Sequence, residues 1–117
     1  MKPFLAIGAL LGAAAVVLGA FGAHALKTRL DGEALSLWQT AVQYHFWHAL
    51  ALLATPRLAG AWAKAAGWLF VGGVVLFSGS LYALALGAPR AVGMVTPVGG
   101  LALILGWLAF AVAAIRA

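Results

Sequence analysis

Four long stretches of this chain contain no Asp, Glu, Lys or Arg. These stretches are residues 3–26, 34–56, 65–89 and 91–115. Each is long enough for one helix crossing, because about 20 apolar residues span a hydrocarbon core of about 30 Å. A charge at the centre of an inserted helix costs about 2.5–3.5 kcal/mol, which explains why the charges are confined to the connections. The pattern predicts an all-α integral membrane four-helix bundle that forms a single transmembrane domain over residues 1–117. We expect its helices at about residues 3–23, 33–55, 66–87 and 97–115.

The composition excludes an ordinary soluble domain. Hydrophobic residues make up 66% of the chain and charged residues 8%, whereas soluble domains carry about 25% charged residues. The net charge of +5 comes from basic residues spread along the edges of the predicted helices, which fits anionic lipid headgroups better than nucleic acid. The chain has no cysteine, so it has no disulfide framework and no Cys-x-x-Cys motif. We therefore expect membrane lipids, and no nucleic acid, among its partners.

The first apolar stretch resembles a signal peptide in one respect. Ala23, His24 and Ala25 fit the small-x-small pattern of a cleavage site. The apolar part, however, is about 20 residues long, which exceeds the 7–15 residues of a signal core. We therefore expect it to be retained as the first membrane helix.

The distribution of charges gives a weak indication of topology. Four crossings place both termini on one side of the membrane. That side would carry Lys2, Arg57, Lys64 and Arg116. The opposite side would carry Lys27, Arg29 and Arg90. Because cytoplasmic edges are enriched in basic residues, we expect a protein of the cytoplasmic (inner) membrane with both termini in the cytoplasm. Segment 24–36 holds both acidic residues and is expected at the membrane interface.

Small residues recur at helical spacing on three of the predicted helices. The first helix carries Gly8, Gly12, Ala15, Gly19 and Ala23. The fourth carries Gly99, Ala102, Gly106, Ala109 and Ala113. In the third, Gly72 pairs with Gly79 and Gly73 with Ser80 at a spacing of seven. Such rows let membrane helices approach closely. We expect them to pack the bundle and to support a homo-oligomer.

The second predicted helix differs from the others because it has a polar stripe. At 100° per residue, one sector of about 140° contains Glu33, Ser36, Thr40, Gln43, Tyr44, Trp47 and His48. Lipid cannot satisfy such groups, so this side must face the bundle interior, a partner or water. His45 lies about 60° beyond His48, at the edge of the stripe. Ser78 and Tyr82 share a face of the third helix and are the expected partners.

Several readings of this polar group are open. The residues concerned are His24, Gln43, Tyr44, His48, Ser78, Ser80, Tyr82 and Thr96. They can act as hydrogen-bonding contacts between helices, as a pocket for a quinone, lipid headgroup or haem, or as a proton or ion pathway. A metal site is the least favoured reading, because His45-x-x-His48 supplies two ligands where a closed zinc site needs four. Thr96 is also a candidate N-cap, with Pro97 at the first helical position.

Four ordered segments carry a family resemblance. They are GAFGAHAL (19–26), TAVQYHFWHALALL (40–53), LFSGSLYAL (76–84) and TPVGG (96–100), followed by Gly106-Trp107. The chain resembles the domain-of-unknown-function 423 family, which is related to the transmembrane protein 256 of mitochondria and includes small bacterial inner-membrane proteins. The resemblance implies a four-helix membrane protein with no established activity. The family positions that it implies here are His24, Tyr44, His48, Ser78, Gly79, Ser80, Tyr82, Thr96 and Pro97. His45 departs from the pattern, where another residue type is common.

These observations favour a non-enzymatic multi-pass membrane protein that acts as a scaffold or assembly factor. Its partners would be lipids, a second copy or another membrane protein. No catalytic group is visible, because both carboxylates are interfacial and no nucleophile has a base beside it. No cofactor or metal is evident. The first alternative is a binding protein for a membrane-soluble quinone, lipid or haem, and the second is a proton or ion conduit.

Overall fold

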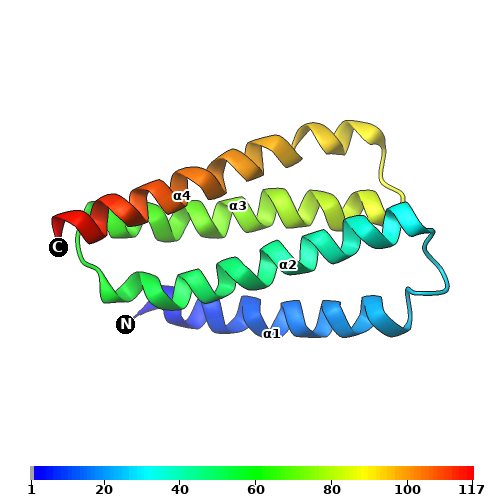
Figure 1. Ribbon diagram of the computed structural model, residues 1–117, viewed down its shortest axis with the longest axis horizontal. Helices are drawn as coiled ribbons and strands as arrows, with labels where there is room; N and C mark the ends of the chain where they lie inside the picture. The colour runs from blue at the N-terminus through cyan, green and yellow to red at the C-terminus, as the bar shows by residue number, and fades with distance from the viewer. Residues whose placement is uncertain (1) are drawn as a thin grey trace.

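The computed structural model describes residues 2–117 and shows four long helices (Figure 1). They are α1 (Pro3–His24), α2 (Gly32–Ala54), α3 (Ala61–Ala85) and α4 (Thr96–Arg116). Two short 3-10 helices, η1 (Thr55–Arg57) and η2 (Arg90–Met94), lie in the connections. The four long helices contain 21 to 25 residues, or about 32–38 Å at 1.5 Å per residue, which matches the thickness of a bilayer core. No strand occurs within residues 2–117. The all-α prediction is confirmed.

The ends of the helices have local causes. Pro3 opens α1 at a position where its missing N–H is no loss. Asp31 caps α2, because its carboxylate accepts a hydrogen bond of 2.8 Å from the backbone N–H of Ala34. Gly60 and Gly87 adopt positive φ angles of 95° and 99°, a conformation that glycine adopts without steric cost. They set the turn before α3 and the turn after it.

Three boundary predictions need correction. The start of α3 is Ala61, not residue 66, because the Gly60 turn begins the helix and Lys64 keeps its charge exposed in the first turn. The proposed interfacial segment 24–36 is shorter than predicted, since the Asp31 cap starts α2 at Gly32. Thr96 does not cap α4: it is the first helical residue, and its hydroxyl bonds elsewhere.

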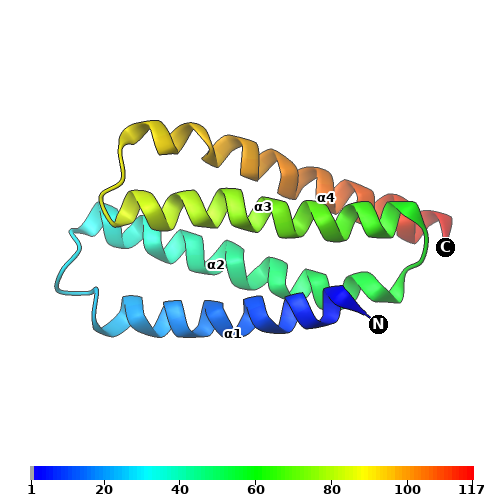
Figure 2. The same ribbon diagram turned by 180° about the vertical axis from the view of Figure 1, so that it is seen from behind.

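Consecutive helices form the main interfaces of the bundle. In Figures 1 and 2, α2 lies beside α1, α3 beside α2, and α4 beside α3, so that α1 and α4 form the two outer edges. The start of α1 and the end of α4 lie at the same end of the bundle (Figure 1). Antiparallel neighbours follow from the short connections between them.

Three segments are apolar and long enough to cross a membrane by themselves. They are Pro3–His24, Ala61–Ala85 and Arg90–Arg116. The polar stripe keeps α2 out of this group, so the four predicted helices are not equally apolar. Because α2 packs between α1 and α3 over its length (Figures 1 and 2), we infer that it crosses with them, with its two histidines buried among its neighbours.

The core lies along the centre of this arrangement. Phe70 of α3 and Leu52 of α2 are fully buried and pack with Phe4, Val74 and Leu103. These residues come from all four helices, so the core joins the outer edges to the central pair. Aromatic contacts reinforce it, with the rings of Phe70 and Trp107 centred 5.0 Å apart in an edge-on arrangement.

The glycines of the predicted packing rows behave differently from one another. A Cβ built on Gly99 would lie 2.3 Å from the backbone nitrogen of Phe77, and one on Gly106 would lie 2.8 Å from the Phe70 ring. Gly8 is equally confined, with the Ala49 carbonyl oxygen 3.0 Å from its Cβ position. These three glycines allow backbones or core rings to approach closely, as predicted.

Among the other predicted glycines, Gly73 is confined, with the Leu103 side chain 2.4 Å from its Cβ position, whereas the remaining predictions are weaker or wrong. A Cβ on Gly19 would meet Val42 at 3.3 Å, and one on Gly12 would meet only Ala49 at 4.0 Å. Gly72 and Gly79 face open space, with nothing within 4 Å, so they do not pack the bundle. Sequence reasoning missed two confined glycines. They are Gly22, which lies against Trp38, and Gly67, which lies against Phe4.

The contrast between Gly99 and Gly72 gives a first test. Gly99→Ala places a methyl group against the α3 backbone, which cannot rotate away, and should destabilise the bundle by about 1–3 kcal/mol. Gly72→Ala should be neutral or stabilising by up to about 1 kcal/mol, because alanine favours the helix and meets no neighbour. Thermal unfolding of both variants in mild detergent, followed by circular dichroism, measures the difference. Equal melting temperatures would contradict the close approach of α3 and α4.

Candidate functional site

His48 is held between two helices at one edge of the polar stripe. Its Nδ1 lies 2.6 Å from the backbone carbonyl oxygen of Tyr44, one turn earlier in α2. Its Nε2 lies 3.0 Å from Nε1 of Trp107 in α4. The side chain is 4% exposed, so these two bonds account for both ring nitrogens and link α2 directly to α4.

The partners of His48 fix its protonation state and tautomer. A carbonyl oxygen only accepts, so Nδ1 must carry the proton and donate it. The indole N–H of Trp107 only donates, so Nε2 must be the unprotonated acceptor. A second proton would place two donors against each other. His48 is therefore a neutral ring with no free nitrogen, and it can bind a metal or relay a proton only if Trp107 moves away.

His45 makes a second link, from α2 to α3. Its Nδ1 lies 2.9 Å from the hydroxyl of Tyr82, whose ring packs edge-on against Trp38 with centroids 4.7 Å apart. Its Nε2 is buried and makes no hydrogen bond of standard geometry within residues 2–117, but the backbone carbonyl of Leu11 in α1 lies close to the ring. His45 is thus fully inside the bundle, rather than at the edge of the stripe as the helical angles suggested.

Serine hydroxyls connect α3 to both of its neighbours. Ser78 donates to the backbone carbonyl of Ala41 in α2 at 2.7 Å. The Ser80 hydroxyl donates to the Phe77 carbonyl at 2.9 Å and is also hydrogen-bonded to the hydroxyl of Thr96 at the start of α4. On the far side of α2, the indole of Trp38 donates to the Leu18 carbonyl of α1 at 2.9 Å. Each helix interface therefore has at least one polar bond.

The side chain of Tyr44 lies outside this network, in a groove between α2 and α4. The groove has a volume of about 510 Å³. Its lining is Tyr44, Trp47, His48, Phe77, Gly100, Leu103, Ile104 and Trp107. The Tyr44 hydroxyl makes no hydrogen bond within residues 2–117, and its ring packs on Phe77 with centroids 4.6 Å apart. We call this feature the α2/α4 groove; α3 forms its floor.

Two of the predicted site residues do not join the others. His24 is exposed at the end of α1, whereas His48 is buried in the last third of α2. Gln43 is exposed rather than inward, because the buried side of α2 is the one that carries Trp38, His45 and Leu52, on the opposite side of the helix. The expected pairs were also different: Ser78 and Tyr82 do face α2, but they bond Ala41 and His45.

Sequence reasoning missed the role of Trp107. An indole N–H in a membrane helix needs a partner, and this requirement was the only signal available. No helix-angle argument could choose His48 as that partner, because it depends on the relative placement of α2 and α4. Among residues 2–117, no group of three or more His, Cys, Asp or Glu residues is placed to hold a metal ion.

The fold and its network define a class: a small multi-pass α-helical membrane protein whose helices are joined by buried side-chain hydrogen bonds. Within that class, the chain belongs to the family described as protein of unknown function DUF423, whose pattern matches residues 18–100. This confirms the resemblance carried by the four sequence segments.

Relatives match the chain over nearly its whole length. The UPF0382 membrane protein YwdK of Bacillus subtilis is 44% identical over 121 residues, covering 99% of this chain and 98% of the relative. A UPF0382 membrane protein of Staphylococcus epidermidis is 43% identical, with the same coverage. One from Staphylococcus saprophyticus is 46% identical over 92% of each chain. No solved structure matches. The chain is therefore a membrane protein of an uncharacterised family.

The two tyrosines provide a matched test of the hydrogen-bond network. Tyr82→Phe removes the partner of His45 Nδ1 inside the bundle and should lower stability by about 0.6–1.7 kcal/mol. Tyr44→Phe removes a hydroxyl without a partner and should change stability by less than about 0.5 kcal/mol. Thermal unfolding in detergent compares the two variants, which lose the same atom. A larger loss for Tyr44→Phe would show that the network has been assigned to the wrong residues.

Proposed function

We propose that this protein is a non-enzymatic membrane scaffold that holds a neighbouring transmembrane helix in the α2/α4 groove. The helix would come from a partner membrane protein or from a second copy of this chain. The observation that carries the proposal is that the buried polar groups and the open apolar surface lie in different parts of the molecule. Apart from Nε2 of His45, the buried polar side-chain atoms of residues 2–117 bond within the bundle, whereas the groove offers an open apolar surface.

The hydrogen-bond network supports a role without chemistry. Both ring nitrogens of His48 are hydrogen-bonded, one to the Tyr44 carbonyl and one to Trp107. The hydroxyls of Ser78 and Ser80 bond to backbone carbonyls. A catalytic base or nucleophile needs a free lone pair or proton within reach of a substrate. A conduit needs a continuous series of exchangeable groups, but His48, Ser78 and Ser80 each bond a backbone carbonyl and do not bond one another. The conduit alternative therefore has less support.

The groove has the shape and composition of a helix-binding surface. Gly100 has no side chain to fill the groove. A Cβ at this position would lie at ordinary contact distances of 3.6–3.7 Å from Phe77. Trp47 and Trp107 form the rims and are 51% and 46% exposed. Small residues beside large aromatic ones allow a second helix to approach and to pack. Because α1 and α4 are the outer edges of the bundle (Figure 1), no helix of this chain covers the groove.

One observation favours a second candidate, the binding of a membrane-soluble small molecule. The free hydroxyl of Tyr44 lies among aromatic rings in the groove. Ligand pockets are typically apolar with a few polar groups that orient the ligand. A quinone could stack on these rings and accept a hydrogen bond from Tyr44. This candidate requires the hydroxyl, whereas the binding of a helix requires only the space above Gly100.

Photocrosslinking tests the scaffold proposal. A photoreactive amino acid at position 104, inside the groove, should give a discrete protein adduct in native membranes. The same group at position 105, which is exposed on another side of α4, should give lipid adducts only. Gly100→Leu should abolish the adduct at position 104 by filling the groove, whereas Gly72→Leu, which meets open space, should not. An adduct of twice the chain mass of 11.9 kDa would identify a second copy as the partner.

The same variants separate the two candidates. If a small molecule occupies the groove, mass spectrometry of the purified protein should find it, and both Tyr44→Phe and Gly100→Leu should remove it. If a helix occupies the groove, Tyr44→Phe should leave the adduct unchanged. Lipid adducts alone at both positions 104 and 105 would contradict the scaffold proposal.

We propose further that the protein resides in the cytoplasmic membrane with both termini in the cytoplasm. The end that holds the termini carries four basic side chains and neither acidic one, whereas the other end carries three basic and both acidic side chains. An excess of Lys and Arg is typical of cytoplasmic edges. The chain has no cysteine, so single cysteines at positions 28 and 60 can be labelled without background. In intact cells an impermeant maleimide should label position 28 and not position 60; the reverse pattern would overturn this orientation.

A further inference from the structure

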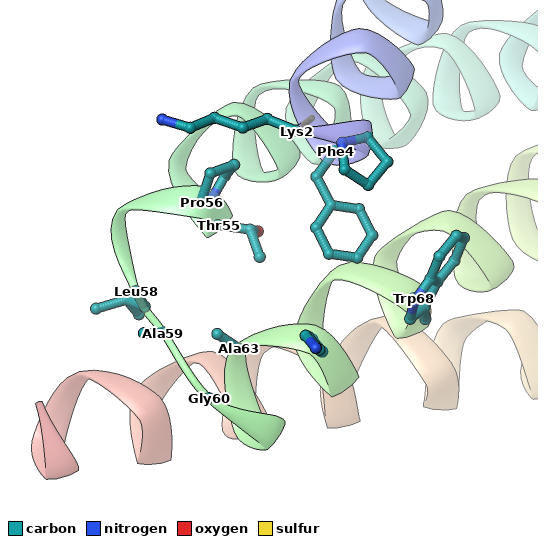
Figure 3. Close-up of a pocket in the computed structure, with 11 residues that line it drawn as sticks. Lys2, Phe4, Thr55, Pro56, Leu58, Ala59, Gly60, Ala63 and Trp68 are labelled. Carbon is teal, nitrogen blue, oxygen red and sulfur yellow. The ribbon is translucent and has the colours of Figure 1, made fainter.

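The basic end of the bundle contains a pocket that is separate from the α2/α4 groove. Its volume is about 480 Å³. Its walls come from the start of α1, the 55–60 connection and the first turns of α3. The lining residues are Lys2, Pro3, Phe4, Thr55, Pro56, Leu58, Ala59, Gly60, Ala63, Lys64 and Trp68. We call it the basal pocket; Figure 3 shows it.

The inner walls of the basal pocket are apolar and are fixed by the core. Phe4 packs on Gly67, where a Cβ would lie 2.4 Å from the ring, and its ring meets Trp68 edge-on with centroids 5.1 Å apart. Figure 3 shows the Phe4 ring between Thr55 on one side and Trp68 on the other. The hydroxyl of Thr55 donates a hydrogen bond to the Ala51 carbonyl, so it does not make the pocket polar. The depth of the pocket therefore suits a hydrocarbon chain.

The outer edge of the pocket is cationic. Lys2 and Lys64 are its charged lining residues, and both are exposed. The acidic side chains of the protein, Asp31 and Glu33, lie at the opposite end of the bundle (Figure 1), so neither lysine has an acidic neighbour. In addition, α3 begins here without a side-chain cap, and the free N–H groups of a helix start favour an anion.

The cationic outer edge and the apolar inner walls of the pocket follow the order of the headgroup and acyl-chain layers of a bilayer. Trp68 lies one turn after Lys64, or about 6 Å further along α3, and is 56% exposed on the outside of the bundle. When Lys64 is at the level of the headgroups, Trp68 and Phe4 are therefore at the level of the upper acyl chains. A ligand here needs a negative headgroup joined to an apolar chain.

We propose that the basal pocket binds an anionic glycerophospholipid. The headgroup phosphate would lie between Lys2 and Lys64, and one acyl chain would lie against Phe4 and Trp68. Basic pockets next to membrane helices bind anionic lipid headgroups. The proposal does not depend on the function of the α2/α4 groove, because no residue lines both features.

Native mass spectrometry of the full chain in detergent, with phosphatidylglycerol or phosphatidylcholine added, tests the proposal. Phosphatidylglycerol should be retained and phosphatidylcholine should not. The double variant Lys2→Gln/Lys64→Gln should reduce phosphatidylglycerol binding by tenfold or more. The control Lys27→Gln/Arg29→Gln removes the same charge from the opposite end and should leave binding within twofold of the wild type.

A second variant tests the pocket without changing the charge. Ala59→Trp fills the basal pocket from an exposed position in the connection and should also abolish phosphatidylglycerol binding. Melting curves must show that each variant is folded. Equal effects of the two charge pairs would overturn the proposal in favour of diffuse attraction, and so would equal retention of both lipids by the wild type. Displacement of the lipid by millimolar glycerol phosphate would also overturn it, because the site would then bind a soluble phosphate ester.

Discussion

The structure depends on one constraint: within the hydrocarbon layer, polar groups must find partners inside the protein. Lipid offers no hydrogen bonds, so each unsatisfied group costs several kcal/mol. Here the buried histidines of α2 and the buried serines of α3 reach across to neighbouring helices. Ser78 bonds a backbone carbonyl of α2, and His48 joins α2 to Trp107 of α4. These bonds let a polar helix such as α2 lie in a membrane bundle, and they fix which sides of the helices meet.

Close packing adds to this constraint. Association in lipid gains little from hydrophobic expulsion, so helices must approach closely enough for dispersion forces and short hydrogen bonds to act. Gly99 and Gly106 let α4 lie directly on α3, and Gly8 lets α1 lie on α2. Consecutive pairs thus form the main interfaces, and α1 and α4 remain at the outer edges. This arrangement leaves the α2/α4 groove uncovered by the chain itself.

The functional interpretation follows from where polar atoms are used and where they are free. In the interior, His48 is neutral and doubly bonded, which suits a structural role. The free groups lie elsewhere: the Tyr44 hydroxyl in the groove, and Lys2 and Lys64 at the basal pocket. His45 is likewise buried and joins α2 to Tyr82 of α3.

The sequence by itself determined the fold class, the family and most helix boundaries, because insertion energy depends on the order of apolar and charged residues along the chain. It also marked α2 as the polar helix. Only the tertiary structure decided the partners. Helical periodicity places His45 and His48 on a side of α2, but which atoms they meet depends on the offset and rotation between helices. The same reason explains why Gly72 proved open and Gly67 proved confined: a glycine is a close contact only where another helix happens to lie.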